Sequence, residues 1–192
     1  MAIHELLAQR WSSRRFAPDP LPDATIETLI EAARWAPSYG NRQPWRFVVA
    51  REPATLAALH GTLTRGNAYA TVAPVLIALC GNPDNGQIKD GKQYYLMDAG
   101  MALENLLLQA VGLGLHAHPM GGFDEALVRD VLGIPETVHV LALIAVGRPG
   151  RLEDLDERTR ERELRERTRK PAGAIRADER WAFGEDIDEG KK

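Results

Sequence analysis

Hydrophobic positions divide the chain into segments with helical spacing and segments that are apolar throughout. Helical patterns fall on residues 2–10, 24–36, 53–66, 93–111 and 124–132. In the second of these, Ile26, Leu29 and Ala33 recur at the spacing that places apolar side chains on one helix face. Asp23 is predicted as the N-cap of this helix, and Pro37 as its end.

Three apolar runs predict strands at residues 45–50, 71–81 and 138–147. The second, "TVAPVLIALCG", is apolar at nearly every position, which is typical of a strand buried on both faces. The helix at 93–111 is apolar around much of its circumference, so we expect it to be central to the domain or to pack against a second subunit. Because no regular strand–helix–strand repeat appears, the pattern predicts an α+β fold, with residues 1–192 forming one domain.

The C-terminal part differs in composition. Fifteen of the twenty residues at 151–170 are Asp, Glu, Lys or Arg, with both signs mixed. This predicts a solvated helix with i, i+4 ion pairs that serves as a charged connector. Residues 171–192 regain Pro, Gly and aromatic residues, so we expect them to pack on the core or on a partner subunit.

Overall composition narrows the class of protein. A net charge of −3 gives no reason to expect nucleic acid or an anionic membrane as a partner. The single cysteine, Cys80, excludes an internal disulfide, and its apolar surroundings favour an inert buried thiol. No signal-peptide core is visible, and no run reaches the roughly 20 apolar residues of a membrane span. We therefore expect a cytoplasmic protein.

Familiar catalytic signatures such as His-Glu-x-x-His, a Walker loop or Gly-x-Ser-x-Gly are absent. His116 and His118 are spaced i, i+2, which alone does not indicate a metal site, and none is expected. Four polar clusters remain as candidates for chemistry: "RWSSRRF" at 10–16, "PSYGNRQP" at 37–44, "HPMGGFDE" at 118–125 and "RTRKP" at 167–171.

Each cluster has two interpretations when taken alone. In an extended segment Arg10, Ser12 and Arg14 share one face and form an anion site, but a solvated basic turn is the alternative. Gly121 and Gly122 allow backbone N–H groups to approach a ligand closely, or they form a turn before a helix that begins near Asp124.

Taken together and in order, these clusters resemble the FMN-dependent nitroreductase family. "RWSSRRF" resembles its Arg-x-Ser-x-Arg/Lys box, and "AARWAPSYGNRQPWRFVV" is similar to its Ala-Ala-Arg-x-Ala-Pro-Ser-x-x-Asn-x-Gln-Pro-Trp stretch. The family's central helix resembles "DAGMALENLLLQAVGLGL", and its flavin-edge loop resembles "PMGGF". Its strand ending in Gly-x-Pro resembles "LGIPETVHVLALIAVGRP", and its C-terminal basic box resembles "RTRKP". Trp11 stands where many members carry Arg or His, and Tyr39 is bulkier than the residue common there.

The resemblance implies a three-layer fold, with a mixed or antiparallel sheet between helices, and an intertwined homodimer with FMN at the subunit interface. The FMN phosphate and ribityl chain would be surrounded by Arg10, Trp11, Ser12, Arg167 and Arg169. Arg14 would lie near flavin N1 and O2. The partner subunit would supply Pro37, Ser38, Tyr39, Asn41 and Gln43 beside the ring. Pro119, Met120, Gly121 and Gly122 would present backbone to N5 and O4, and Asn67 would bond the pyrimidine edge.

The implied activity is an NAD(P)H-dependent oxidoreductase. Hydride would pass from NAD(P)H to flavin N5, and then, in a ping-pong sequence, to a nitroaromatic, a quinone or a related conjugated electrophile. Three alternatives stay open: another chemistry on the same fold, such as reductive dehalogenation or flavin fragmentation; a non-enzymatic flavin-binding protein; and an interaction protein that docks through residues 151–170. The sequence does not choose between NADH and NADPH, nor does it name the acceptor.

Overall fold

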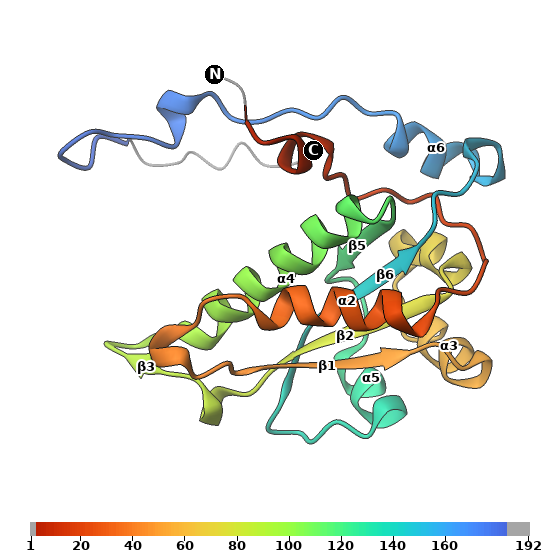
Figure 1. Cartoon of the computed structure of the whole chain (residues 1–192), viewed down its shortest axis with the longest axis horizontal. Helices are drawn as coiled ribbons and strands as arrows, with labels where there is room; N and C mark the ends of the chain where they lie inside the picture. Colours follow the sequence, from red (N-terminus) through yellow and green to blue (C-terminus); the bar gives the residue numbers. More distant parts are fainter. Residues whose placement is uncertain (1–2, 184–192) are drawn as a thin grey trace.

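The structure is a computed structural model that describes residues 3–183 (Figure 1). Its α-helices are α1 (Glu5–Gln9), α2 (Asp23–Arg34), α3 (Pro53–His60), α4 (Tyr94–Gly112), α5 (Glu125–Leu132) and α6 (Glu157–Glu163). Its strands are β1 (Trp45–Ala50), β2 (Val75–Gly81), β3 (Ile88–Lys89), β4 (Lys92–Gln93), β5 (His116–Met120) and β6 (His139–Gly147). Short 3-10 segments are η1 (Tyr39–Asn41), η2 (Arg65–Val72), η3 (Pro83–Asn85), η4 (Leu152–Asp154) and η5 (Ala172–Ala174).

The main sheet has the order β1-β2-β6-β5, and each neighbouring pair is antiparallel. All seven residues of β2 are buried, because this strand has a neighbour on each side and helices over both faces. The β3–β4 pair forms a separate small hairpin before α4.

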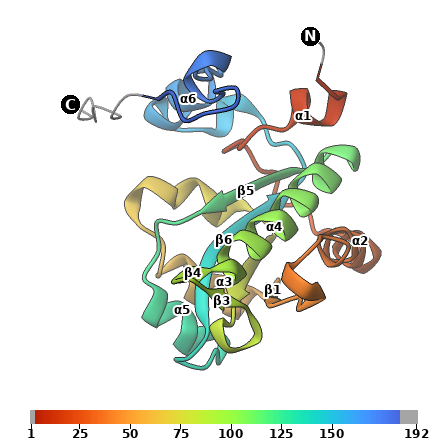
Figure 2. The ribbon, with the colours of Figure 1, turned by 90° about the vertical axis from the view of Figure 1, so that its left-hand side faces the viewer.

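Helices cover both faces of the sheet, which makes three layers (Figure 2). Val75, Ile77 and Leu79 of β2 join the cluster that includes α2 and α4. The intervening residues of β2, Cys80 among them, join the opposite cluster with α3, α5 and η2. Burial raises the pKa of the Cys80 thiol to about 11, so this side chain is an inert core residue as predicted. The α+β, three-layer prediction is confirmed.

Most of the predicted elements are present, but three details were wrong. The helix predicted at 53–66 ends at His60, because the chain then bonds the 121–124 loop: Thr64 N donates to the Gly122 carbonyl. Asp23 is the first helical residue of α2 and not its N-cap; its carboxylate pairs with Arg51 instead. The segment "GLGLHAHP" continues into strand β5, which the apolar pattern did not reveal because two of its five residues are histidines.

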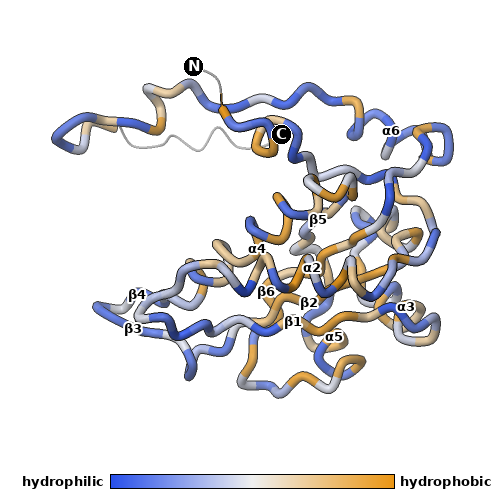
Figure 3. Tube along the Cα trace, in the orientation of Figure 1, coloured by the Kyte–Doolittle hydropathy of each residue, from blue (hydrophilic) through white to orange (hydrophobic). Residues whose placement is uncertain are grey.

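The charged segment is also less helical than predicted. Within 151–170 only η4 and α6 are helical, and its charged side chains make long-range contacts. The described part of the C-terminal segment does not pack on its own core: Ile175 and Trp181 are 70% and 83% exposed. Figures 1 and 3 show the chain after α6 running across the top of the molecule as a mostly polar stretch. Residues 184–192 lie outside the described range. Its packing on a partner subunit stays a prediction.

No helix within residues 3–183 has both the length and the apolar content needed to cross a membrane.

Candidate active site

Glu163 at the end of α6 organises the N-terminal segment. Its buried carboxylate accepts hydrogen bonds from Ser13 Oγ at 2.6 Å, Arg14 N at 2.8 Å and Arg15 Nε at 3.2 Å. Burial alone would raise the pKa of Glu163, but these three bonds outweigh it and hold the pKa below its usual value. The segment is therefore fixed in an extended form against α6.

Two histidines of β5 hold the same segment from the other side. His118 Nδ1 lies 3.0 Å from the Ser13 carbonyl oxygen, and His116 Nδ1 lies 2.8 Å from that of Arg15. Because a carbonyl only accepts, each Nδ1 carries the proton, and His118 Nε2 is left to accept from the Tyr69 hydroxyl at 3.0 Å. Burial lowers the pKa of His118 to about 4, so the ring is neutral at pH 7. His116 and His118 thus hold the backbone of the N-terminal segment at Arg15 and Ser13.

The segment lines a cavity of about 280 Å³ with the C-terminal basic box. The cavity is lined by Arg10, Trp11, Ser12, Arg14 and Arg169. Arg10 donates to Ser12 Oγ at 3.3 Å and lies 3.9 Å from Glu104 of α4. Arg167 lies over the Trp11 ring, 5.4 Å from its centroid, and donates to the Ala8 carbonyl. The structure therefore brings together, at one place, residues predicted from the two ends of the chain.

Cations are crowded around this cavity. The pKa of Arg167 is lowered by desolvation and by the charges of Arg10 and Arg169. The pKa of Arg14 is lowered chiefly by burial and then by the nearby Arg162. Arg14 Nε is buried and has no hydrogen-bond partner within the described chain. An anion in the cavity would relieve this repulsion.

The glycine loop, which is the 121–124 segment after β5, is held by hydrogen bonds from the start of η2. The Gly122 carbonyl accepts from Thr64 N at 3.0 Å and from Asn67 Nδ2 at 2.9 Å. A Cβ on Gly122 would lie 2.6 Å from Thr64 Oγ1, whereas one on Gly121 would meet open space. Met120 is buried in the core and pairs with Leu143 of β6, and Pro119 carries no N–H. Asn67 acts here as the support of the loop.

The polar loop at 37–43 lies apart from the arginine cavity, which is the cavity lined by Arg10, Trp11, Ser12, Arg14 and Arg169. Tyr39 N donates to Asp98 Oδ1 of α4 at 3.1 Å, and the rings of Tyr39 and Tyr94 are 4.9 Å apart. Gly40, Asn41 and Gln43 all have positive φ, at 56°, 56° and 49°. In both ribbon views the loop sits beside the N-terminal end of α4, away from the first residues of the chain (Figures 1 and 2).

The loop is held by its own side chains. Ser38 Oγ accepts from Gln43 N, and the Gln43 amide donates to Asn41. Pro37 is exposed at the end of α2. None of these residues lines the arginine cavity of the same protomer.

The sequence assigned no role in the site to four residues that build it. Glu163 and Arg162 were hidden in the charged run, where a solvated face was expected. His118 and Tyr69 gave no periodic signal, although the i, i+2 spacing of His116 and His118 marks one face of a strand.

The model of the nitroreductase family matches residues 7–148, about three quarters of the chain. The chain belongs to the nitroreductase family. The matched range includes the arginine segment, the 37–43 loop and the glycine loop, and it ends before the charged C-terminal part.

Individual relatives agree with this assignment. A Thermus thermophilus protein named NADH dehydrogenase is 33% identical over 174 residues, covering 73% of this chain and 83% of that protein. An Archaeoglobus fulgidus protein named putative NADH dehydrogenase/NAD(P)H nitroreductase is 31% identical, covering 80% and 88%. A crystal structure described as an oxidoreductase containing FMN has a TM-score of 0.86 and 31% identity, covering 96% of this chain and 95% of its own.

Proposed function

We propose that this nitroreductase-family protein binds FMN and works as an NAD(P)H-dependent oxidoreductase. The observation that carries the proposal is the arginine cavity, which gathers like charges and a buried, unpartnered Arg14 Nε around one space. The crystal structure described as containing FMN, similar over nearly the whole chain, supports the same cofactor.

The residues present fit the cofactor. A phosphate dianion suits the guanidiniums of Arg10 and Arg169 and the hydroxyl of Ser12, because charge-assisted bonds to phosphate are short and strong. Arg167, fixed over Trp11, adds positive charge beside them. Arg14 is the cation for the flavin ring, where positive charge stabilises the reduced form. The glycine loop supplies backbone N–H groups.

We infer that the working unit is a homodimer. The 37–43 loop does not line the arginine cavity of its own protomer, and a second protomer would supply it. Leu96 and Met97 of α4 are 46% and 55% exposed, although seven of the nineteen residues of this helix are buried. Exposed apolar residues gathered on one element indicate a protein interface.

The proposed reaction is ping-pong. FMN held by these residues would supply two-electron chemistry between NAD(P)H and, once the nicotinamide has left, a nitroaromatic, a quinone or a related conjugated electrophile. The chain's own residues bind and orient: the arginines hold the charged groups, and the glycine loop and the partner's 37–43 loop shape the space for the two substrates in turn. No strong acid or base is needed from the protein.

The Arg14→Ala variant tests this proposal. It should fold normally, since among residues 3–183 the side chain donates a single long hydrogen bond, 3.5 Å to the Arg162 carbonyl. It should release FMN more readily or show a lower flavin reduction potential, and oxidise NAD(P)H more slowly with a quinone. Flavin content after gel filtration and the potential are the measurements. Arg151→Ala, at an exposed position paired only with Glu153, is the matched control. Unchanged flavin affinity, potential and turnover in Arg14→Ala would refute the role of Arg14.

A further inference from the structure

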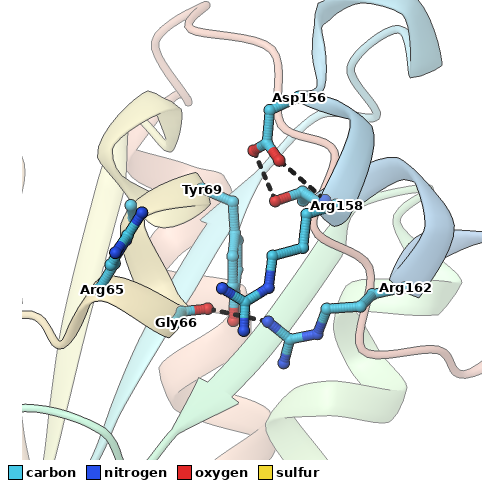
Figure 4. A pocket seen from close by; sticks show the side chains of 8 residues that line it. Arg65, Gly66, Tyr69, Asp156, Arg158 and Arg162 are labelled. Carbon is cyan, nitrogen blue, oxygen red and sulfur yellow. Dashed lines mark hydrogen bonds between the residues drawn. The ribbon is translucent and has the colours of Figure 1, made fainter.

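A second basic cavity lies between η2 and α6 (Figure 4). Its volume is about 340 Å³, and it shares no lining residue with the first cavity. Arg65, Gly66 and Tyr69 come from η2, and Asp156, Arg158 and Arg162 come from the start and body of α6. In Figure 4 the side chains of Arg158 and Arg162 extend from α6 toward Tyr69 and Gly66, and Arg65 stands on the other side, on η2.

The positive charges in this cavity are largely uncompensated. The guanidiniums of Arg65 and Arg158 have no hydrogen-bond or ion-pair partner among residues 3–183. Arg162 donates to the Gly66 carbonyl at 3.2 Å, which fixes its position but does not neutralise it. The lining also holds one carboxylate, Asp156, which accepts from Thr159 N at 3.0 Å and from Thr159 Oγ1 at 2.7 Å. Three guanidiniums therefore face one carboxylate in this lining.

Arg14 connects the two cavities. It lines the first cavity, and its guanidinium lies over the Tyr69 ring at 5.7 Å and donates to the Arg162 carbonyl. Tyr69 and Arg162 in turn line the second cavity. The side chain of Arg14 therefore lies between a molecule bound in the first cavity and the lining of the second cavity.

We propose that the second cavity binds the phosphate monoester dianion of a substrate, and that its source is the 2′-phosphate of NADPH. Converging guanidiniums with free N–H donors match the charge and the geometry of a phosphate group. NADH lacks this group, so Arg65 and Arg158 would make the protein prefer NADPH. This inference rests on the proposed function, because it assigns the electron donor of that same reaction.

Calorimetric titration of the FMN-loaded protein tests the site without any turnover. The probes are 2′-AMP, which carries the 2′-phosphate, adenosine, which is the same molecule without it, and inorganic phosphate. We expect 2′-AMP to bind at least about 10-fold more tightly than adenosine, since charge-assisted hydrogen bonds are made only by the former. The difference should vanish in the double variant Arg65→Gln/Arg158→Gln and persist in Arg34→Gln, an exposed arginine of α2 that lines neither cavity.

Each outcome decides one part of the proposal. If inorganic phosphate binds as tightly as 2′-AMP and the double variant loses both, the cavity is a phosphate site but NADPH is not its source. If no phosphate probe binds, or if binding is the same in the double variant, the proposal is wrong.

Steady-state kinetics separate this inference from the proposed function. The double variant should raise KM for NADPH by about 10-fold or more, with little change in kcat and in KM for NADH. Equal use of both coenzymes, unaffected by the double variant, would overturn the phosphate site while leaving the oxidoreductase intact. Failure to oxidise either coenzyme would instead overturn the proposed function, and the calorimetric comparison would still report on the cavity.

Discussion

Glu163 joins α6 to three consecutive residues of the N-terminal segment through its two carboxylate oxygens. Replacing it with Gln keeps the shape but removes the charge and turns one acceptor into a donor. Glu163→Gln should lower the free energy of unfolding by about 1.5–3 kcal/mol, the usual worth of hydrogen bonds to a charged group. Denaturant titration measures this loss. Glu161→Gln, an exposed position on the same helix, is the control and should change little.

The same residue makes the protein sensitive to acid. The pKa of Glu163 is below the 4.5 of a free glutamate, so its stabilising effect is complete above pH 4.5. It is lost as the pH falls from there through the lower folded pKa. His118 contributes a separate loss between pH 6.5 and about 4, where only the unfolded chain takes up the proton. Glu163→Gln should flatten the stability curve below pH 4.5 alone; a parallel curve for the variant would contradict the assignment.

At the element scale, the apolar pattern was a good guide wherever an element is packed on hydrophobic neighbours. β1, β2, β6 and α2 match their predicted ranges to within a few residues. The pattern failed for β5 and η2, because polar side chains and backbone bonds hold them in place: His118 bonds Ser13, and Asn67 bonds Gly122. Such contacts join residues far apart in the chain, so no local periodicity reveals them.

The contact between η2 and the glycine loop gives a prediction at the scale of elements. A methyl group on Gly122 would collide with the side-chain atoms Thr64 Oγ1 and Asn67 Nδ2, at 2.6 and 2.7 Å, so these side chains or the loop must shift. Gly122→Ala should lower the free energy of unfolding by roughly 1–3 kcal/mol, as overpacking does. Thermal unfolding of the flavin-free protein measures it. Gly121→Ala, whose Cβ would meet open space, should be close to neutral; equal losses in both would show that the packing is not the cause.

At the scale of the whole molecule, the sequence predicted more of the residues that line the cavity than of the residues that hold them in place. The motifs placed Arg10, Ser12 and Arg169 in one group, and they line one cavity although they come from opposite ends of the chain. The structure alone showed that α6 holds this group, because a buried Glu163 looks like any other charge in the run at 151–170.

The proposed dimer makes a prediction about α4. Replacing Leu96 and Met97 with Glu should give a monomer with reduced flavin content, because charges on an apolar interface disfavour association. Light scattering after gel filtration reports the mass, and absorbance reports the flavin. Leu127→Glu, at a residue of α5 that is 47% exposed, is a control of similar exposure on another helix. A monomeric wild-type protein, or a Leu96→Glu/Met97→Glu variant that is still dimeric, would remove this interface from the account.

The most direct test of the central claim is an anaerobic titration of the purified protein with NAD(P)H, followed by its visible absorbance. We expect a yellow protein that releases FMN on denaturation, loses its flavin absorbance after a stoichiometric addition of the reduced nicotinamide, and regains it when a quinone is added. A colourless protein with no releasable flavin, or a bound flavin that neither nicotinamide reduces, would contradict it.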